Sequence, residues 1–286
     1  MADWPEPDID PGNGLRVGTW NLDRDRPLWR QPHQADHVRS QADLWLLTEV
    51  PANWQFGTAN TSFSQSRPNE DDQYWSGIIS RWHVEPIATK HPSLALARID
   101  HPGEPFLAAA SVFPWRGAAE FWPTGDGDTF ADRCVNTLDA HAAEICEARC
   151  GLPVVWGGDF NQALSGRDYV GSDAGRAALL KAFEHLRLRA VTVKSHGQVP
   201  PHQSIDHIAI PQGGVQRMLR FSDHRSMAGS LATIHRMSCR SHGHRSSGLL
   251  PEVVMRCVCE QVWQDISDHI CHTERRPSVP ALLTVF

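Results

Sequence analysis

The stretch Leu152–Leu164, LPVVWGGDFNQAL, contains an apolar run, two glycines, an acid and an amide in close succession. Its first five residues are apolar without alternation, which is typical of a strand that is covered on both faces. The run stops at Gly157–Gly158, where the backbone can turn sharply and approach a ligand closely. We therefore expect Asp159 and Asn161 to be presented at one end of a buried strand.

Short strand candidates continue the pattern along the chain. The segment 15–22, LRVGTWNL, and the apolar run 44–47 in QADLWLLTEV predict two strands, and 34–41 can form a short helix between them. Residues 52–72 are polar and contain prolines, which predicts a loop. The strand candidates between 74 and 113 leave little room for helices, which favours antiparallel hairpins.

Two amphipathic helices flank the buried strand in the sequence. The segment 129–151 has apolar residues at helical spacing and ends in Gly151, and 172–186 begins with Ser172 or Asp173 as a helix cap. Short strand candidates then follow. We predict an α/β (α+β) fold, a four-layer sandwich of two mixed, largely antiparallel β-sheets with outer helices.

Composition and charge indicate the domain organisation. The chain has 286 residues with a net charge of −6, which is ordinary for a globular protein and argues against a strongly basic, nucleic-acid-coating surface. Residues 1–14 are acidic and rich in Pro and Gly, and they predict a disordered lead-in. We expect 15–233 to form the catalytic domain and 234–286 to be a Cys/His-rich appendage, in which 248–270 can form one helix.

The sequence does not predict a signal peptide. The N-terminal residues have neither a basic nor an apolar leader region, and there is no apolar run of the length that spans a membrane. The seven cysteines follow no disulfide-framework spacing. We therefore expect a cytoplasmic protein with reduced thiols and without a transmembrane segment.

Acidic and amide side chains recur where the predicted strands end. If these ends share one rim of the sandwich, the acids would repel one another strongly unless a cation lies among them. Oxygen ligands suit a hard divalent ion, so we expect Mg²⁺ or Mn²⁺ acting on a phosphate. The residues concerned are Asn21, Asp23, Glu49, Asp159, Asn161, Asp206, Asp223 and His224.

Five motifs occur in a characteristic order along the chain: TWNLD, LTEV, GGDFN, SIDHI and SDHRS. With these motifs the sequence resembles the endonuclease/exonuclease/phosphatase superfamily, metal-dependent phosphodiesterases that include DNase I-like and abasic-site nucleases. The resemblance covers roughly residues 15–233. It implies a DNase I-like sandwich and Mg²⁺-dependent hydrolysis of a phosphate ester.

The resemblance also implies which residues hold the metal. Glu49 matches the principal metal-binding residue of the family. Asn21 and Asp23 match positions that line the metal and the phosphate, and Asp223 matches the acid of the SDH motif on the metal side.

Four further residues match catalytic positions of the family. Asp159 matches the acid that activates or orients the attacking water, and Asn161 matches the amide that holds the nucleophile or the phosphate. His224 matches the histidine that contacts the scissile phosphate, and Asp206 matches the acid that pairs with it. Such a pairing would favour the charged imidazolium near neutral pH.

One strand departs from the family pattern. The family usually has a His or Tyr that reaches the phosphate from a central strand, but the matching segment here offers Ser111, Val112 and Phe113. Arg116 could take over as the substrate-binding contact, because a guanidinium matches phosphate geometry, or it could be a surface loop residue. The departure leaves the substrate subgroup open.

Three readings of function follow from the sequence. The first is a phosphodiesterase, most readily a nuclease, in which metal-assisted water attacks in line and nucleic acid is a candidate substrate. The second is a phosphatase of inositol phosphates or phospholipid headgroups. The third is a non-catalytic binding protein with a relic site.

Overall fold

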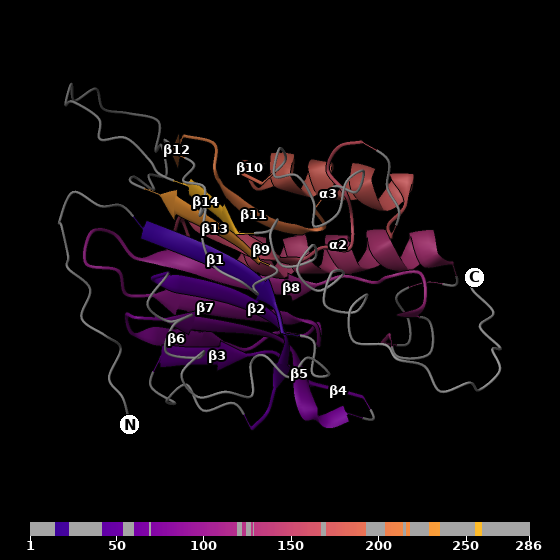
Figure 1. The fold of residues 1–286 in the computed structure, drawn as a ribbon, viewed down its shortest axis with the longest axis horizontal. Coiled ribbons are helices and arrows are strands. Elements are labelled where there is room, and N and C mark those ends of the chain that lie inside the picture. Colours follow the sequence, from indigo (N-terminus) through magenta and orange to yellow (C-terminus); the bar gives the residue numbers. More distant parts are fainter. Residues whose placement is uncertain are drawn as a thin grey trace, which may run out of the picture.

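Two β-sheets pack face to face, and two helices cover the outer face of one of them (Figure 1). This arrangement confirms the predicted sandwich of two mixed sheets. The computed structural model describes residues 15–22, 42–53, 60–68, 70–118, 122–123, 127, 129–166, 170–192, 204–213, 216–217, 229–234 and 255–258.

The first sheet has eight strands. Their bounds are β1 Leu15–Asn21, β2 Leu44–Pro51, β3 Thr61–Phe63, β4 Ser66–Arg67, β5 Glu70–Ser80, β12 Gln216–Arg217, β13 Gly229–Ile234 and β14 Met255–Val258. The order is β12-β13-β1-β2-β5-β3, while β14 pairs with β13 and β4 pairs with β5. Only the central pair β1–β2 is parallel among these described strands.

The second sheet has six strands. Their bounds are β6 Val84–Ile87, β7 Leu94–Ile99, β8 Phe106–Val112, β9 Val154–Asp159, β10 Leu188–Ala190 and β11 Asp206–Pro211. The order is β10-β11-β9-β8-β7-β6, with a parallel pair β8–β9 and antiparallel neighbours. Helices α2 (Phe130–Ala148) and α3 (Asp173–His185) lie on its outer face.

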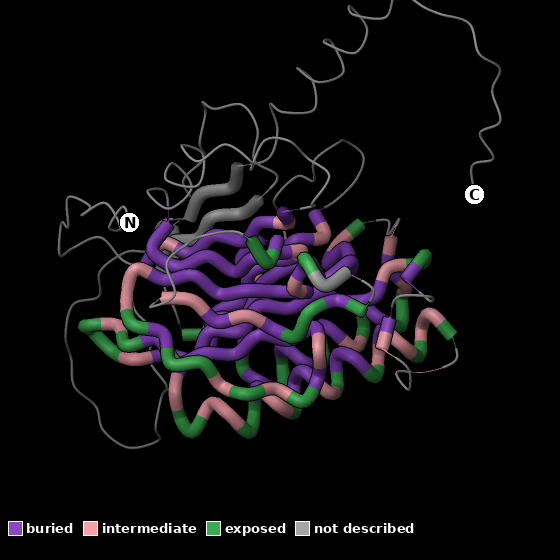
Figure 2. Tube along the Cα trace, turned by 90° about the horizontal axis from the view of Figure 1, so that it is seen from below, coloured by how far each residue is buried: buried purple, intermediate pink, exposed green. Residues whose placement is uncertain are grey.

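Two apolar cores explain why the central strands read as continuous hydrophobic runs. Between the sheets, Leu46 and Ile78 of the first sheet share a core with Ala108 and Ile208 of the second. The other face of the second sheet packs on the helices, so β8 and β9 are buried along their whole length (Figure 2). A strand that is covered on both faces needs no polar alternation.

Side-chain caps set the first turn of both helices. Thr129 Oγ1 accepts a hydrogen bond from the backbone of Asp132, whose carboxylate accepts one from the backbone of Thr129, and this reciprocal pair is a capping box. Ser172 Oγ accepts a hydrogen bond from the amide of Gly175. Ser172 is therefore the cap of α3, as one of the two predicted alternatives has it.

The structure corrects two predictions of local structure. The segment 52–72, which the sequence predicts to be a loop, contains β3, β4 and the start of β5. These strands are short or lie at a sheet edge, so the apolar signal that marks a buried strand is weak. In the segment 248–270 we expected a helix, but Met255–Val258 form β14. The helix predicted at 34–41 and the lead-in 1–14 lie outside the described residues.

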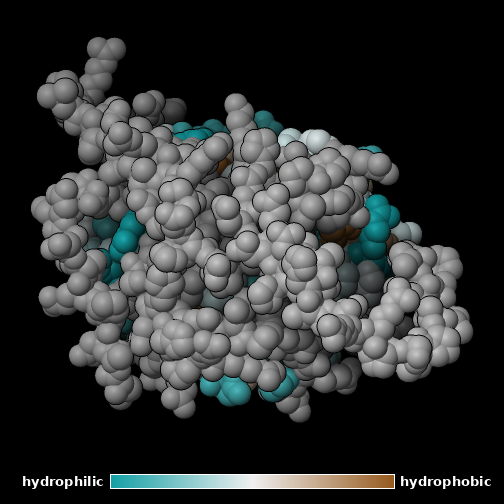
Figure 3. All heavy atoms as spheres, in the orientation of Figure 1, coloured by the Kyte–Doolittle hydropathy of each residue, from teal (hydrophilic) through white to brown (hydrophobic). Residues whose placement is uncertain are grey.

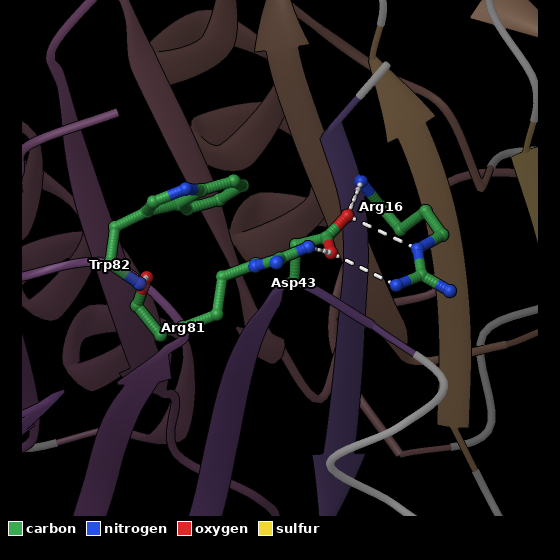
Figure 4. Close-up of polar contacts among 5 residues, drawn as sticks. Arg16, Asp43, Arg81 and Trp82 are labelled. Atoms are coloured by element: carbon green, nitrogen blue, oxygen red, sulfur yellow. Dashed lines mark hydrogen bonds and ion pairs between the residues drawn. The ribbon is translucent and has the colours of Figure 1, made fainter. Parts of the chain in front are cut away.

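An ion cluster fastens the first sheet where β1 and β2 begin (Figure 4). The buried carboxylate of Asp43 accepts hydrogen bonds from the Arg16 side chain at 2.9 and 3.1 Å and from Arg81 Nη1 at 3.1 Å. The Arg81 guanidinium also lies 5.5 Å from the centre of the Trp82 ring. Because β1, β2 and the end of β5 meet here, the cluster holds three strands in register.

Hydrophilic side chains account for much of what is visible of the described residues in Figure 3, and Leu180 is an exposed large hydrophobic residue. Within the described ranges, no helix has both the length and the apolar character needed to cross a membrane.

Candidate active site

The ends of strands from both sheets meet at the rim opposite the Asp43 cluster. Asn21, the last residue of β1, donates a hydrogen bond from Nδ2 to Asp159 Oδ2 at 3.0 Å, and Asp159 is the last residue of β9. The two residues are 138 positions apart in the sequence. This bond spans the sandwich and places an amide and an acid at one site.

A second acid lies directly opposite Asp159. Asp206, the first residue of β11, is the antiparallel partner of Asp159. It is buried, and its Oδ1 has no hydrogen-bond partner in the described structure. Carboxylates at directly opposed positions repel each other. Repulsion between two ionised carboxylates at these positions therefore favours the protonated form of one of them.

Burial shapes the protonation of both acids. Burial raises the pKa of Asp159 to about 6, against the opposing influence of hydrogen bonds from Asn161 and Asn21. Burial also raises the pKa of Asp206 well above its usual value, and the charges of Asp159 and Glu49 raise it further. Glu49 at the end of β2 thus acts electrostatically on the same pair of acids.

Glu49 and Asn161 have backbones in the left-handed region, with φ of 54° and 48°. This conformation is unfavourable for residues other than glycine, and strained backbones cluster at functional sites. The carbonyl of Glu49 accepts a hydrogen bond from Gln73 Nε2 at 3.1 Å. Asn161 Nδ2 donates to the Phe113 carbonyl at 2.8 Å, and its backbone amide donates to Asp159 Oδ1 at 3.0 Å.

The sequence predicts that the strand stops at the two glycines before Asp159. They do not end the strand, since β9 runs through both of them to Asp159. Gly158 has φ of 134°, and a Cβ there would collide with the Ser111 carbonyl of β8. A Cβ on Gly157 would lie 2.8 Å from the His207 carbonyl of β11. The glycines therefore permit close strand packing beneath the acids.

The three remaining metal and phosphate candidates, Asp23, Asp223 and His224, lie outside the described residues. Arg116 is described, but its contacts lead elsewhere. Its Nη2 donates to the Gly171 carbonyl at 2.9 Å, and its guanidinium lies 5.5 Å from the centre of the Phe130 ring. These contacts join the loop after β8 to the starts of α2 and α3. A direct substrate contact from Arg116 stays a prediction.

Ser111, which stands on the strand where the family has a His or Tyr, hydrogen-bonds within the helix-side core. Its Oγ accepts from Trp156 Nε1 at 2.8 Å and lies 3.1 Å from His141 Nδ1. His141 Nε2 lies 2.9 Å from His91 Nδ1. Burial, and secondarily His91, holds the pKa of His141 well below its usual value. This hydrogen-bonded network packs behind the start of β7 and the end of β8.

Sequence reasoning missed a cation beside Glu49. Arg67 Nη1 lies 3.8 Å from Glu49 Oε1 and donates to Gln73 Oε1 at 2.6 Å. Its guanidinium also lies near the rings of Trp75 and Trp115. The residue falls in the segment that the sequence predicts to be a loop. No periodic signal could have placed it, because β4 has only two residues.

The donor set fits a hard divalent ion. Carboxylate and amide oxygens are its preferred ligands, and Oδ1 of the buried Asp206 has no hydrogen-bond partner among the described residues. Within the described ranges, no three His, Cys, Asp or Glu side chains converge closely enough to enclose an ion. Mg²⁺ commonly keeps several waters and binds only one or two carboxylates. Among the described residues, Glu49 together with Asn21 would therefore be enough to hold it.

Residues 18–280 match the family model of the Endonuclease/Exonuclease/phosphatase family. The chain belongs to this family. Membership of the Endonuclease/Exonuclease/phosphatase family identifies a phosphoesterase-type enzyme and agrees with the motifs on which the sequence resemblance rests. The match also extends past residue 233, at which we placed the end of the catalytic domain.

Two solved structures are similar in fold. The endonuclease domain of TRAS1, a telomere-specific non-LTR retrotransposon, has a TM-score of 0.51 and 13% identity, covering 78% of this chain and 98% of that one. An endonuclease/exonuclease/phosphatase from Beutenbergia cavernae DSM 12333 has a TM-score of 0.50 and 14% identity, covering 79% and 72%. No curated protein matches the sequence significantly. The likeness shows the fold alone, an α/β sandwich of two sheets.

Proposed function

We propose that the chain is a Mg²⁺- or Mn²⁺-dependent phosphodiesterase, most readily a nuclease, that uses in-line attack of water. The main support is the hydrogen bond from Asn21 to Asp159 across the two sheets, with Asp206 opposite Asp159. An amide and two acids thus lie together at one rim, where the charge of Glu49 acts on Asp206. Chance surface acids would not be buried in this way.

In this proposal Glu49 is the principal ligand of the divalent ion, with Asn21 beside it and Asp23 and Asp223 on the metal side. When bound, the ion supplies neutralising charge for the phosphoryl oxygens and makes a coordinated water more acidic. The ion would also relieve the repulsion among the acids, whose pKa values burial now raises.

Asp159 acts as the base for the attacking water. Both of its oxygens are held, Oδ2 by the Asn21 amide and Oδ1 by the Asn161 backbone, so the carboxylate has a fixed direction. A pKa of about 6 leaves it mostly ionised at neutral pH, yet basic enough to accept a proton. Asn161 orients the nucleophile or the phosphate.

Asp206 supports a charged His224 in this mechanism. A buried carboxylate with an oxygen that has no described partner would stabilise an imidazolium placed next to it. The charged His224 then faces the scissile phosphate and neutralises charge that develops on its oxygens. Without such a partner Asp206 retains its proton, because burial and two neighbouring charges all raise its pKa.

A substrate panel tests the proposal. Purified full-length protein is incubated with Mg²⁺ or with EDTA, and with single- and double-stranded DNA, RNA, inositol phosphates and phosphoinositide vesicles. We expect cleavage of a nucleic acid that EDTA abolishes and that Glu49→Gln lowers strongly. Release of phosphate from inositol phosphates or vesicles alone would replace the nuclease with a phosphatase. Divalent-ion binding without hydrolysis of any substrate would support the relic reading.

A further inference from the structure

Arg67 occupies a clamp between two tryptophans at the candidate site. Its guanidinium carbon lies 4.7 Å from the centre of the Trp75 ring and 5.8 Å from that of Trp115. Both distances are within the range of cation–π attraction. Only 9% of the Arg67 side chain is exposed, so the clamp restricts its orientation. Arg67 belongs to β4, whereas Trp115 belongs to the loop after β8, so the clamp joins the two sheets.

The clamped guanidinium orients the residue that supports Glu49. Arg67 Nη1 donates to Gln73 Oε1 at 2.6 Å, which directs the Gln73 amide nitrogen toward β2. That nitrogen donates to the Glu49 carbonyl at 3.1 Å. Gln73 is itself buried, so it cannot easily exchange these partners for water. The chain of contacts runs from two tryptophans through Arg67 and Gln73 to the backbone of Glu49.

Glu49 is a residue that needs such support. Its φ of 54° is unfavourable for a side chain other than glycine, so its neighbours must hold it in place. Arg67 also acts on the Glu49 carboxylate, at 3.8 Å from Oε1. This distance is too long for a hydrogen bond, but it is short enough for electrostatic attraction. Arg67 therefore influences both the backbone and the carboxylate of Glu49.

We infer that Arg67 is a positioning residue which, through Gln73 and its own charge, holds Glu49 in the orientation that binds a divalent ion. The inference rests on the proposed function, in which Glu49 is the principal ligand. Outer-shell partners of this kind commonly change metal affinity tenfold or more when they are replaced.

Charge and positioning predict opposite effects on metal binding. A guanidinium close to the ion repels it, so a role by charge alone means that neutralising Arg67 tightens binding. If Arg67 acts by positioning, loss of the planar guanidinium weakens Mn²⁺ binding even when the positive charge is kept. Arg67→Lys keeps the charge but removes the fork and weakens the stacking. Gln73→Met removes the link to Glu49 without changing any charge.

Direct Mn²⁺ binding to the full-length protein, followed by the electron paramagnetic resonance signal of the free ion, separates these roles. We expect Arg67→Lys and Gln73→Met each to weaken Mn²⁺ binding about tenfold. Excess Mn²⁺ should then restore the hydrolysis rate while KM for the substrate stays unchanged. Thermal unfolding of each variant reports whether it is folded. Trp115→Leu, which removes the half-exposed ring of the clamp, provides a third variant if the two buried changes prevent folding.

Arg81→Lys is the matched control. Arg81 also contacts a tryptophan ring and a buried acid, Asp43, but at the other end of the sheet (Figure 4). It should change stability while Mn²⁺ binding stays at the wild-type level. The positioning role would be overturned if Arg67→Lys bound Mn²⁺ with the wild-type affinity, whether or not Gln73→Met did so as well. Absence of Mn²⁺ binding by the wild-type protein would instead overturn the proposed function, and the inference with it.

Discussion

Asp159 and Asp206 lie opposite each other on adjacent strands, and burial raises the pKa of both. Neither acid has an arginine or lysine among its described hydrogen-bond partners. The folded state without metal therefore tends to retain a proton that the unfolded chain releases. This difference links stability to both pH and divalent ions.

We predict that Asp159 weakens the fold as pH rises in the absence of metal. Its pKa is about 6 in the folded state and near 3.8 when unfolded, so stability falls between about pH 4 and pH 6. The loss is on the order of 3 kcal/mol for this residue. Urea denaturation in EDTA at pH 4.5 and 7.5 measures about 2 kcal/mol of this loss, as the difference between wild type and Asp159→Asn. Mg²⁺ should recover stability at the higher pH, and an equal pH response of the two proteins would contradict the prediction.

Substitution of the two acids should affect turnover differently. Asp159→Asn removes the base and should lower kcat by about 10²–10⁴-fold. Asp206→Asn should lower the pKa of His224, because an amide does not favour the imidazolium, and so move the high-pH limb of the rate profile to lower pH. The pH dependence of kcat/KM measures both effects. A wild-type profile and rate in Asp206→Asn would exclude His224 as a charged phosphate ligand.

Residue types at strand ends were sufficient to predict that Asn21, Asp159 and Asp206 would meet. Asn21 ends β1 in one sheet, Asp159 ends β9 in the other, and Asp206 begins β11. The expectation that such positions share one rim of the sandwich needs no knowledge of side-chain packing. Arg67 and Gln73 could not be predicted in this way. Their importance depends on which rings and carbonyls they touch, and those contacts come from other strands.

At the level of elements, the close approach of β8 and β9 is what brings the acids to the rim. Gly158 has φ of 134° and lies against the backbone of Ser111, so no side chain fits between the two strands at this point. The close approach of the glycine pair to a ligand, which the sequence suggests, stays a prediction. The structure adds another reason for Gly158, packing of main chain against main chain, and this depends on the parallel register.

We predict that Gly158→Ala strongly destabilises the fold, whereas Gly151→Ala is tolerated. Both glycines have positive φ, but a Cβ on Gly151 would meet no atom within 4 Å. Gly151→Ala should therefore lower the free energy of unfolding by only about 1–2 kcal/mol. Gly158→Ala adds a backbone collision and should lower it by more than about 3 kcal/mol. Soluble yield and urea denaturation measure both, and similar stabilities would contradict the packing role.

Element prediction succeeded where strands are buried and failed where they are short. The runs that form β1, β2, β8 and β9 are apolar because both faces are covered, and their type could be read directly. The edge strands β3 and β4 have three and two residues, too few to show alternation. β14 differs again, since its strand state depends on pairing with β13.

For the whole molecule, the role of the C-terminal appendage is open to a direct test. The motif set is complete by His224, so we predict that a chain ending at residue 234 hydrolyses its substrate within a few-fold of the full-length rate. Met255–Val258 pair with β13, and their removal leaves β13 hydrogen-bonded to β1 and β12. Circular dichroism and activity of the truncated chain measure the effect. Loss of folding would make β14 part of the domain.

The parallel pair β1–β2 has its ion cluster at one end and its candidate ligands at the other. Arg16 of the cluster lies five residue steps before Asn21 on β1, a span of about 17 Å, so substitutions at the two ends should add in free energy without coupling. Variation can therefore act on each end separately. Better ion pairing around Asp43 would raise the free energy of unfolding. The protein could then tolerate destabilising substitutions near Asn21 and Glu49 that create new ligand sets, and still fold. The same strands that fix the present chemistry leave room for another.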